Sequence, residues 1–252
     1  MRRRFFVDRF DHSRAVLAGE AAHHASRVLR AAAGQLFELS DGQAVWLARV
    51  ASVRRDAVEF ELLEPVTVIL PRLHTALLLA IVKFDRFEWA LEKATELGVA
   101  EITPLAAARS EKALVGAAAK RAVRWQKILA ESAQQSRRLR APALHPVARP
   151  ADAFRAVSHP ETSESAGATE PTVRLFFSES PDAPTLHAVF RTRGTAARAF
   201  LAIGPEGGWT DAERAAALAH QFSEVSLGPT ILRTETAVAA ALASVNYALG
   251  EP

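Results

Sequence analysis

AIGPEGGWTDAER, residues 202–214, connects an apolar run to the start of a helix. The apolar residues 200–203 predict a buried strand, and Thr210 with Glu213 forms a capping box that begins a helix. The glycines between them allow another group to lie against bare backbone, and Pro205 cannot extend a strand because it lacks an N–H. The pattern predicts a loop at the carboxyl end of a parallel strand, where open α/β sheets bind ligands. A simple strand-to-helix turn is the alternative.

A second stretch, SLGPTILRTETAVAAAL at 226–242, repeats this pattern. An apolar strand again ends in Gly-Pro, and an alanine-rich helix follows that Thr234 or Thr236 can cap. Two strands of one sheet that both end in such loops predict a shared crevice. Alternatively, both are turns, and Arg233 and Glu235 form a solvent-exposed pair at the helix start.

A third stretch, ESAQQSRRLRAP at 131–142, places Glu131, Gln135 and Arg138 at i, i+4 and i+7. This spacing puts the three side chains on one helical face. Such a face could contact phosphates or a polar base edge, or it could be an ordinary exposed helix face.

The part of the chain from residue 74 onward alternates between strands and helices. The continuous apolar run 75–82 is typical of a strand in a parallel sheet. Asp85 and Glu88 form a capping-box pattern for a helix that ends at Gly98. Further strands are predicted at 101–107, 173–178, 199–203 and 223–227, and further helices at 116–138, 152–158, 185–191, 210–220 and 234–249. The alternation predicts an α/β fold with a parallel sheet and right-handed crossovers.

The first part of the chain predicts a small β-rich domain. Residues 35–65 alternate between apolar and polar over short runs, with turns at Asp41-Gly42 and Arg55-Asp56. Residues 19–31 predict one short helix. Prolines at 65 and 71 bracket a connection, so we expect one domain over 1–70 and a second over 74–252. The polar stretch 158–171 predicts a surface loop.

The composition narrows the classes of protein. The chain has 252 residues, of which 49% are apolar, and it contains no cysteine, so neither a disulfide framework nor a thiolate zinc site is expected. This fits a reducing cytoplasm, where we expect the protein to act. No charge-free apolar run approaches the roughly 18 residues of a spanning helix, so no membrane partner is expected. Phosphate-loop and dinucleotide motifs are absent, and His23-His24 lacks metal-ligand spacing.

Basic residues cluster in two parts of the chain, although the net charge is only +3. Arginines are frequent in 1–55, and the segment 120–140 contains many basic residues but only one acidic residue, Glu131. Such clusters favour a polyanionic partner, because each contacted phosphate releases counterions. A generally arginine-rich composition is the alternative explanation.

Together these stretches resemble the RsmE family of 16S ribosomal RNA uridine-N3 methyltransferases, in the SPOUT (trefoil-knot) class. The resemblance rests on KATELGV at 93–99, the segment 135–142, GPEGG at 204–208 and SLGPTILRTETA at 226–237, in this order. Two positions depart from the family pattern: Gln134 stands where the family has an acid, and Arg137 where it often has glycine.

The resemblance implies a PUA-like RNA-binding β-barrel followed by a SPOUT-type α/β domain with a deep C-terminal trefoil knot. It also implies S-adenosylmethionine as cofactor, a homodimer, and 16S rRNA as substrate, within an assembled small ribosomal subunit. The expected reaction is methylation of N3 of one uridine. A ribose 2′-O-methyltransferase of the same class and a non-catalytic RNA-binding protein remain rival readings.

The resemblance implies the cofactor contacts, whereas the catalytic candidates follow from the chemistry of a protonated uracil nitrogen and the RNA contacts from the basic clusters. The expected cofactor contacts are Ile203, Gly204, Pro205, Glu206, Gly207, Gly208, Leu227, Gly228, Ile231, Leu232, Arg233 and Thr234. Glu206 is the candidate base or cofactor-orienting acid, although it could instead shape its loop, and Arg138 and Arg233 are candidates to stabilise a uracil anion. The expected RNA contacts are Arg2, Arg3, Arg4, Arg27, Arg30, Arg124, Gln135, Arg137, Arg138 and Arg140. No metal ligands are expected.

Overall fold

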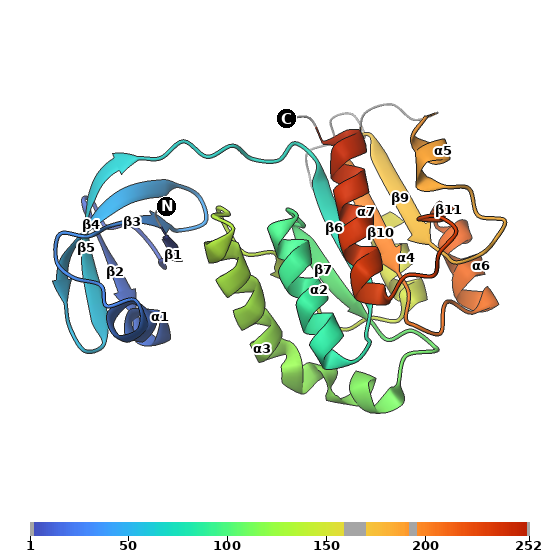
Figure 1. Ribbon diagram of the computed structural model, residues 1–252, viewed down its shortest axis with the longest axis horizontal. Coiled ribbons are helices and arrows are strands. Elements are labelled where there is room, and N and C mark those ends of the chain that lie inside the picture. The colour runs from blue at the N-terminus through green and yellow to red at the C-terminus, as the bar shows by residue number, and fades with distance from the viewer. Residues whose placement is uncertain (1–2, 159–169, 192–195, 251–252) are drawn as a thin grey trace. The chain divides into compact units, whose positions relative to one another are not determined.

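The structure is a computed structural model that describes residues 3–158, 170–191 and 196–250. Its elements form two compact units (Figure 1). The N-terminal unit comprises Met1–Leu70 and Ala130–Ala141, and the C-terminal unit comprises Pro71–Leu129 and Pro142–Pro252. The division into domains 1–70 and 74–252 stays a prediction, and it does not anticipate that 130–141 packs with the first unit. The polar stretch predicted as a surface loop lies largely outside the described residues.

The N-terminal unit is built on a five-stranded sheet in the order β1-β3-β4-β5-β2. Its strands are β1 (Arg4–Phe6), β2 (Arg14–Ala18), β3 (Leu36–Ser40), β4 (Val45–Val53) and β5 (Ala57–Pro65). The predicted Asp41-Gly42 turn joins β3 to β4, because the Asp41 carboxylate accepts the N–H groups of Gln43 and Ala44 at 2.9 Å each. The core contains Phe37, whose ring lies 5.4 Å from Phe5 and 6.2 Å from Phe60.

The helix predicted over 19–31 is instead two short pieces. The α-helix α1 (Gly19–His23) continues directly into a π-helical turn, η1 (His24–Val28). Arg30 then adopts a left-handed backbone conformation with φ of 51° and ends the segment.

The C-terminal unit contains a six-stranded, fully parallel sheet in the order β11-β9-β10-β6-β7-β8. Its strands are β6 (His74–Ala80), β7 (Glu101–Leu105), β8 (Ala143–Leu144), β9 (Thr172–Phe177), β10 (Arg198–Ile203) and β11 (Ser223–Val225). The side chains of Leu77, Leu78 and Leu79 in β6 are almost fully buried because helices cover both faces. Each such burial contributes roughly 2 kcal/mol.

Two layers of helices cover this sheet (Figure 1). The helices are α2 (Phe84–Glu96), α3 (Lys112–Gln135), α4 (Pro150–Ser158), α5 (Leu186–Phe190), α6 (Asp211–Ala219) and α7 (Thr234–Leu249). Helices α2 and α7 pack together on one face, and α4 and α6 on the other. On the second face, Phe154 of α4 packs against Phe176, Phe200 and Phe222. No helix among the described residues is long and apolar enough to cross a membrane.

The predicted capping boxes have different outcomes. Thr210 and Glu213 form the expected box at α6, and the Glu213 carboxylate also accepts the N–H of Ala108 at 2.8 Å. The box at Asp85 and Glu88 is wrong, because α2 begins at Phe84 without a side-chain cap. Glu88 instead accepts hydrogen bonds from Arg121 and Arg124 of α3, at 3.3 and 2.8 Å.

The predicted helical face of Glu131, Gln135 and Arg138 is also wrong, because α3 ends at Gln135. The next residues make a turn in which Arg137 has a φ of 57°, a left-handed conformation that favours glycine. This is the position at which the family pattern often has glycine, so the arginine is held in a conformation that costs about 1 kcal/mol.

A buried ion cluster in the N-terminal unit offsets this cost. Arg4 is only 4% exposed and donates to the Glu38 carboxylate at 2.8 and 3.2 Å. Arg137 donates to the same carboxylate, and its carbonyl oxygen accepts from Arg4 at 2.5 Å. The prediction that Arg4 binds RNA is therefore wrong, because its guanidinium is enclosed by this cluster.

We expect Glu38→Ala to lower the free energy of unfolding by about 3–5 kcal/mol, because it leaves the buried Arg4 without its counter-ion. Urea denaturation followed by circular dichroism measures the change. The control is Glu61→Ala, which removes an exposed pair with Arg49 at 3.7 Å and should cost less than about 1 kcal/mol. Equal losses in the two variants would contradict a special role for Glu38.

Candidate active site

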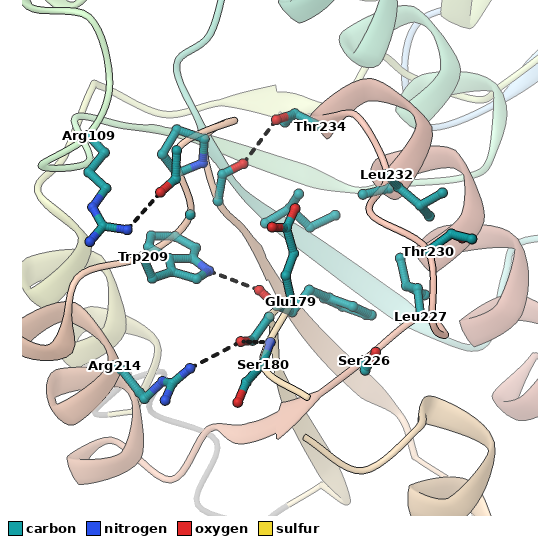
Figure 2. A pocket seen from close by; sticks show the side chains of 18 of the residues that line it. Arg109, Glu179, Ser180, Trp209, Arg214, Ser226, Leu227, Thr230, Leu232 and Thr234 are labelled. Carbon is teal, nitrogen blue, oxygen red and sulfur yellow. Dashed lines mark hydrogen bonds between the residues drawn. The ribbon is translucent and has the colours of Figure 1, made fainter. Parts of the chain in front are cut away.

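Loops that follow neighbouring parallel strands enclose a cavity of about 250 Å³ (Figure 2). β10 leads into the glycine loop, 204–208, and β11 leads into the return loop, 226–233. β9 lies between them in the sheet and contributes 178–180. The shared crevice predicted from the two Gly-Pro loops is thus present in the structure.

Most of the residues expected to bind a cofactor line this cavity. These are Ile203, Gly204, Pro205, Gly207, Gly208, Leu227, Gly228, Leu232 and Thr234. Glu206, Ile231 and Arg233 belong to the same loops but do not line it. For all twelve residues, both those that line the cavity and these three, contact with a cofactor stays a prediction.

The packing of Trp209 explains why residue 204 of the loop is a glycine. A Cβ atom on Gly204 would lie 2.9 Å from the Trp209 indole, which no real Cβ contact allows. The indole cannot move freely, because its N–H donates to the carbonyl of Phe177 at 2.9 Å and its ring stacks on Phe176 at 4.8 Å. The absence of a side chain at Gly204 therefore makes room for the Trp209 indole and also leaves backbone open to the cavity.

Two interactions connect the glycine loop to the start of α7. The Thr234 hydroxyl donates to the carbonyl of Gly204 at 3.1 Å (Figure 2). Arg86, in the first turn of α2, forms an ion pair with Glu206 and lies 3.8 Å from the Glu235 carboxylate. Because α2 packs against α7, Arg86 connects the glycine loop to both helices.

These contacts correct two interpretations of the helix start. Neither Thr234 nor Thr236 caps α7, whose N-cap is Arg233 without a side-chain cap bond. Glu235 lies near Arg86, so it does not pair with Arg233. Arg233 is exposed and makes no ion pair with any residue in the described part of the chain.

Charged side chains that the sequence did not single out also line the cavity. Arg109 follows β7 and donates to the carbonyl of Gly207 at 2.7 Å. Arg214 of α6 contacts Glu224 at 2.9 Å and the Ser178 hydroxyl at 3.3 Å. Glu179 lies two residues beyond the end of β9. Its position after a strand adjacent to β10 is a signal that could have identified it, whereas nothing local marks Arg109 or Arg214.

The candidate catalytic residues have different surroundings. Glu206 is held by Arg86 and does not line the cavity, which argues against it as a base. Arg233 is flanked by two cavity-lining residues. Arg138 belongs to the N-terminal unit, where burial lowers the pKa of its guanidinium to about 10 and the nearby charge of Arg140 adds to the shift. It therefore stays positively charged at neutral pH.

The other candidate RNA contacts remain predictions. Arg3, Arg27, Arg30, Gln135 and Arg140 are exposed. Arg124 and Arg137 are exposed but paired with Glu88 and Glu38, which leaves them less free to contact a phosphate. Arg2 lies outside the described residues. No group of acidic and histidine side chains that could hold a metal ion occurs in the part of the chain that the structure describes.

Comparison with known proteins identifies the families to which the two parts of the chain are similar. Residues 70–246 match the RNA methyltransferase domain family, and residues 17–63 match the RNA methyltransferase PUA domain. The ribosomal RNA small subunit methyltransferase E of Synechocystis sp. is 36% identical over 230 residues, which cover 90% of this chain and 71% of that protein.

Two solved structures extend the similarity to the whole chain. The ribosomal RNA small subunit methyltransferase E of Neisseria gonorrhoeae, bound to S-adenosyl methionine, has a TM-score of 0.84 at 29% identity and covers 99% of both chains. A methyltransferase from Legionella pneumophila with the same bound cofactor has a TM-score of 0.84 at 28% identity and covers 100% of both.

The fold and the site define a SPOUT-type α/β knot protein of the RNA methyltransferase class, with a PUA-like domain at its N-terminus. The expected fold class is confirmed. More particularly, the chain belongs to the ribosomal RNA small subunit methyltransferase E family.

We expect Arg86→Gln and Glu206→Gln each to lower the free energy of unfolding, with a coupling energy of about 1 kcal/mol in the double-mutant cycle. The partial exposure of the pair keeps this value modest. The control cycle uses Arg155 and Asp152, an exposed i,i+3 pair on α4, for which we expect a coupling near zero. Additive effects at Arg86 and Glu206 would show that the pair does not hold the loops.

Proposed function

We propose that this protein transfers a methyl group from S-adenosylmethionine to N3 of a uridine in 16S rRNA, at the family target U1498. The observation that carries the proposal is the cavity at the carboxyl ends of β9, β10 and β11, in a chain of the ribosomal RNA methyltransferase family. The relatives from Neisseria and Legionella bind S-adenosylmethionine, and their folds cover essentially this whole chain.

The cavity has the chemistry that a nucleoside cofactor needs. Ile203, Leu227 and Leu232 supply apolar surface for a purine ring, and the glycine loop supplies backbone groups that no side chain covers. The volume is slightly below the roughly 300 Å³ at which ligand pockets usually begin, so a bent ligand would fill it and reach its mouth. S-adenosylmethionine would supply an activated methyl group on a sulfonium sulfur. The task of the protein is then to align the acceptor nitrogen with that group.

Positive charge is the means that we propose for activating the acceptor. N3 of uracil carries a proton at neutral pH and becomes a good nucleophile only when the proton leaves. Arg109 lines the cavity and Arg233 stands beside it, so both are placed to stabilise a uracil anion. Glu206 is a positioning residue in this proposal, because its ion pair with Arg86 occupies the carboxylate. The proton can then pass to water.

RNA binding is assigned to exposed arginines of the N-terminal unit, such as Arg27, Arg30 and Arg140, through phosphate contacts. The target base must be unpaired or extruded, since pairing occupies N3.

We further propose a cytoplasmic homodimer that acts on the assembled small subunit. An apolar groove between α5 and α7 supports a protein partner, and its edge residue Tyr247 is 92% exposed. Light scattering of the purified protein tests the dimer.

The decisive experiment is methyl transfer from labelled S-adenosylmethionine to 16S rRNA and to small subunits from a strain that lacks this modification. We expect mass spectrometry of the nucleosides to identify 3-methyluridine, with faster transfer to the assembled subunit. Methylated ribose would favour the 2′-O-methyltransferase instead. Cofactor-independent RNA binding without transfer would favour a non-catalytic protein.

A second experiment tests the role assigned to Arg233. We expect Arg233→Ala to slow methyl transfer by about 100-fold at pH 7, because one stabilising charge is lost. The loss should shrink as the pH rises, since N3 then ionises without help. Arg149→Ala, at an exposed arginine away from the cavity, is the control and should leave the rate unchanged. A loss at Arg233 that does not depend on pH would contradict anion stabilisation.

A further inference from the structure

Glu179 lines the cavity and has no partner there. It follows β9 and its side chain extends between Trp209 on one side and Leu227 on the other (Figure 2). The carboxylate is exposed and forms no hydrogen bond or ion pair with any residue that the structure describes. Because this carboxylate is not paired with a cationic side chain, it is available to a positively charged ligand.

The other charged side chains that line the cavity already have partners. Arg109 donates to a loop carbonyl, and Arg214 is paired with Glu224. Glu206 is paired with Arg86 outside the lining. Among the residues described as lining the cavity, Glu179 is the only acid. Its negative charge is therefore the one that a bound cation would experience most directly.

We propose that Glu179 makes the pocket selective for the positively charged methyl donor over the neutral product, S-adenosylhomocysteine. The inference rests on the proposed function, since it places S-adenosylmethionine in this cavity. The two molecules share the adenosine and the amino-acid end and differ in one methyl group and the sulfonium charge. The apolar walls and the glycine loop contact features that both share, so only a charged side chain can distinguish them strongly.

The expected size of the effect follows from Coulomb attraction. Under the proposed function the donor occupies this cavity, which the Glu179 carboxylate lines. At a separation of about 4 Å in such a solvent-exposed site, the attraction between the sulfonium and the carboxylate corresponds to roughly a three- to tenfold preference for the donor. The same preference promotes release of the product once the methyl group and the charge have left.

The test is isothermal titration of the full-length protein with S-adenosylmethionine and, separately, with S-adenosylhomocysteine. Glu179→Gln keeps the shape of the side chain and removes its charge. We expect it to weaken donor binding roughly three- to tenfold and to leave product binding unchanged. Glu179→Asp should retain part of the preference. Asp182→Asn removes an exposed charge that does not line the cavity, and it should change neither affinity.

The possible outcomes separate this inference from the proposed function. Binding of both ligands with an unchanged affinity ratio in Glu179→Gln would overturn the inference alone. An equal loss for both ligands would also overturn it, because it would place Glu179 on the amino group that they share. Failure of the unaltered protein to bind either ligand would overturn the proposed function together with the inference.

Discussion

The hydrogen bond from Thr234 to the carbonyl of Gly204 is the constraint on which the site depends. It fixes the return of the chain from the edge strand β11 to the centre of the sheet, where β10 ends. Arg86 reinforces it by holding Glu206 and Glu235 from α2. Because these contacts join the glycine loop to the start of α7, the two Gly-Pro loops are not the independent turns that the sequence left open as an alternative.

Local signals explain what the sequence predicted well. The apolar run at 75–82 predicts β6 because a parallel strand buried on both faces needs apolar residues throughout. The capping box at Thr210 and Glu213 predicts the start of α6 because its partners are three residues apart. The Gly-Pro loops predicted the crevice for a similar reason, since strand ends on one edge of a parallel sheet lie together.

Contacts between distant residues explain what the sequence missed. Glu88 fits a local cap, but arginines more than thirty residues away bind it instead. Arg4 belongs to a basic cluster in the sequence, yet Glu38 and the turn at Arg137 enclose it. Neither Arg86 nor Glu179 stands in a motif that periodicity detects. Their roles arise from the strand order, which composition and spacing do not determine.

The composition of the cavity also has a consequence for biosynthesis. Its lining runs from Arg109 to Ala237, so the pocket includes residues from the last helix described as well as from the middle of the chain. A nascent chain that has not yet released α7 lacks the Thr234 contact and has no complete pocket. Ligand capture must therefore wait until translation of this segment is finished, and the cofactor cannot assist the earlier stages of folding.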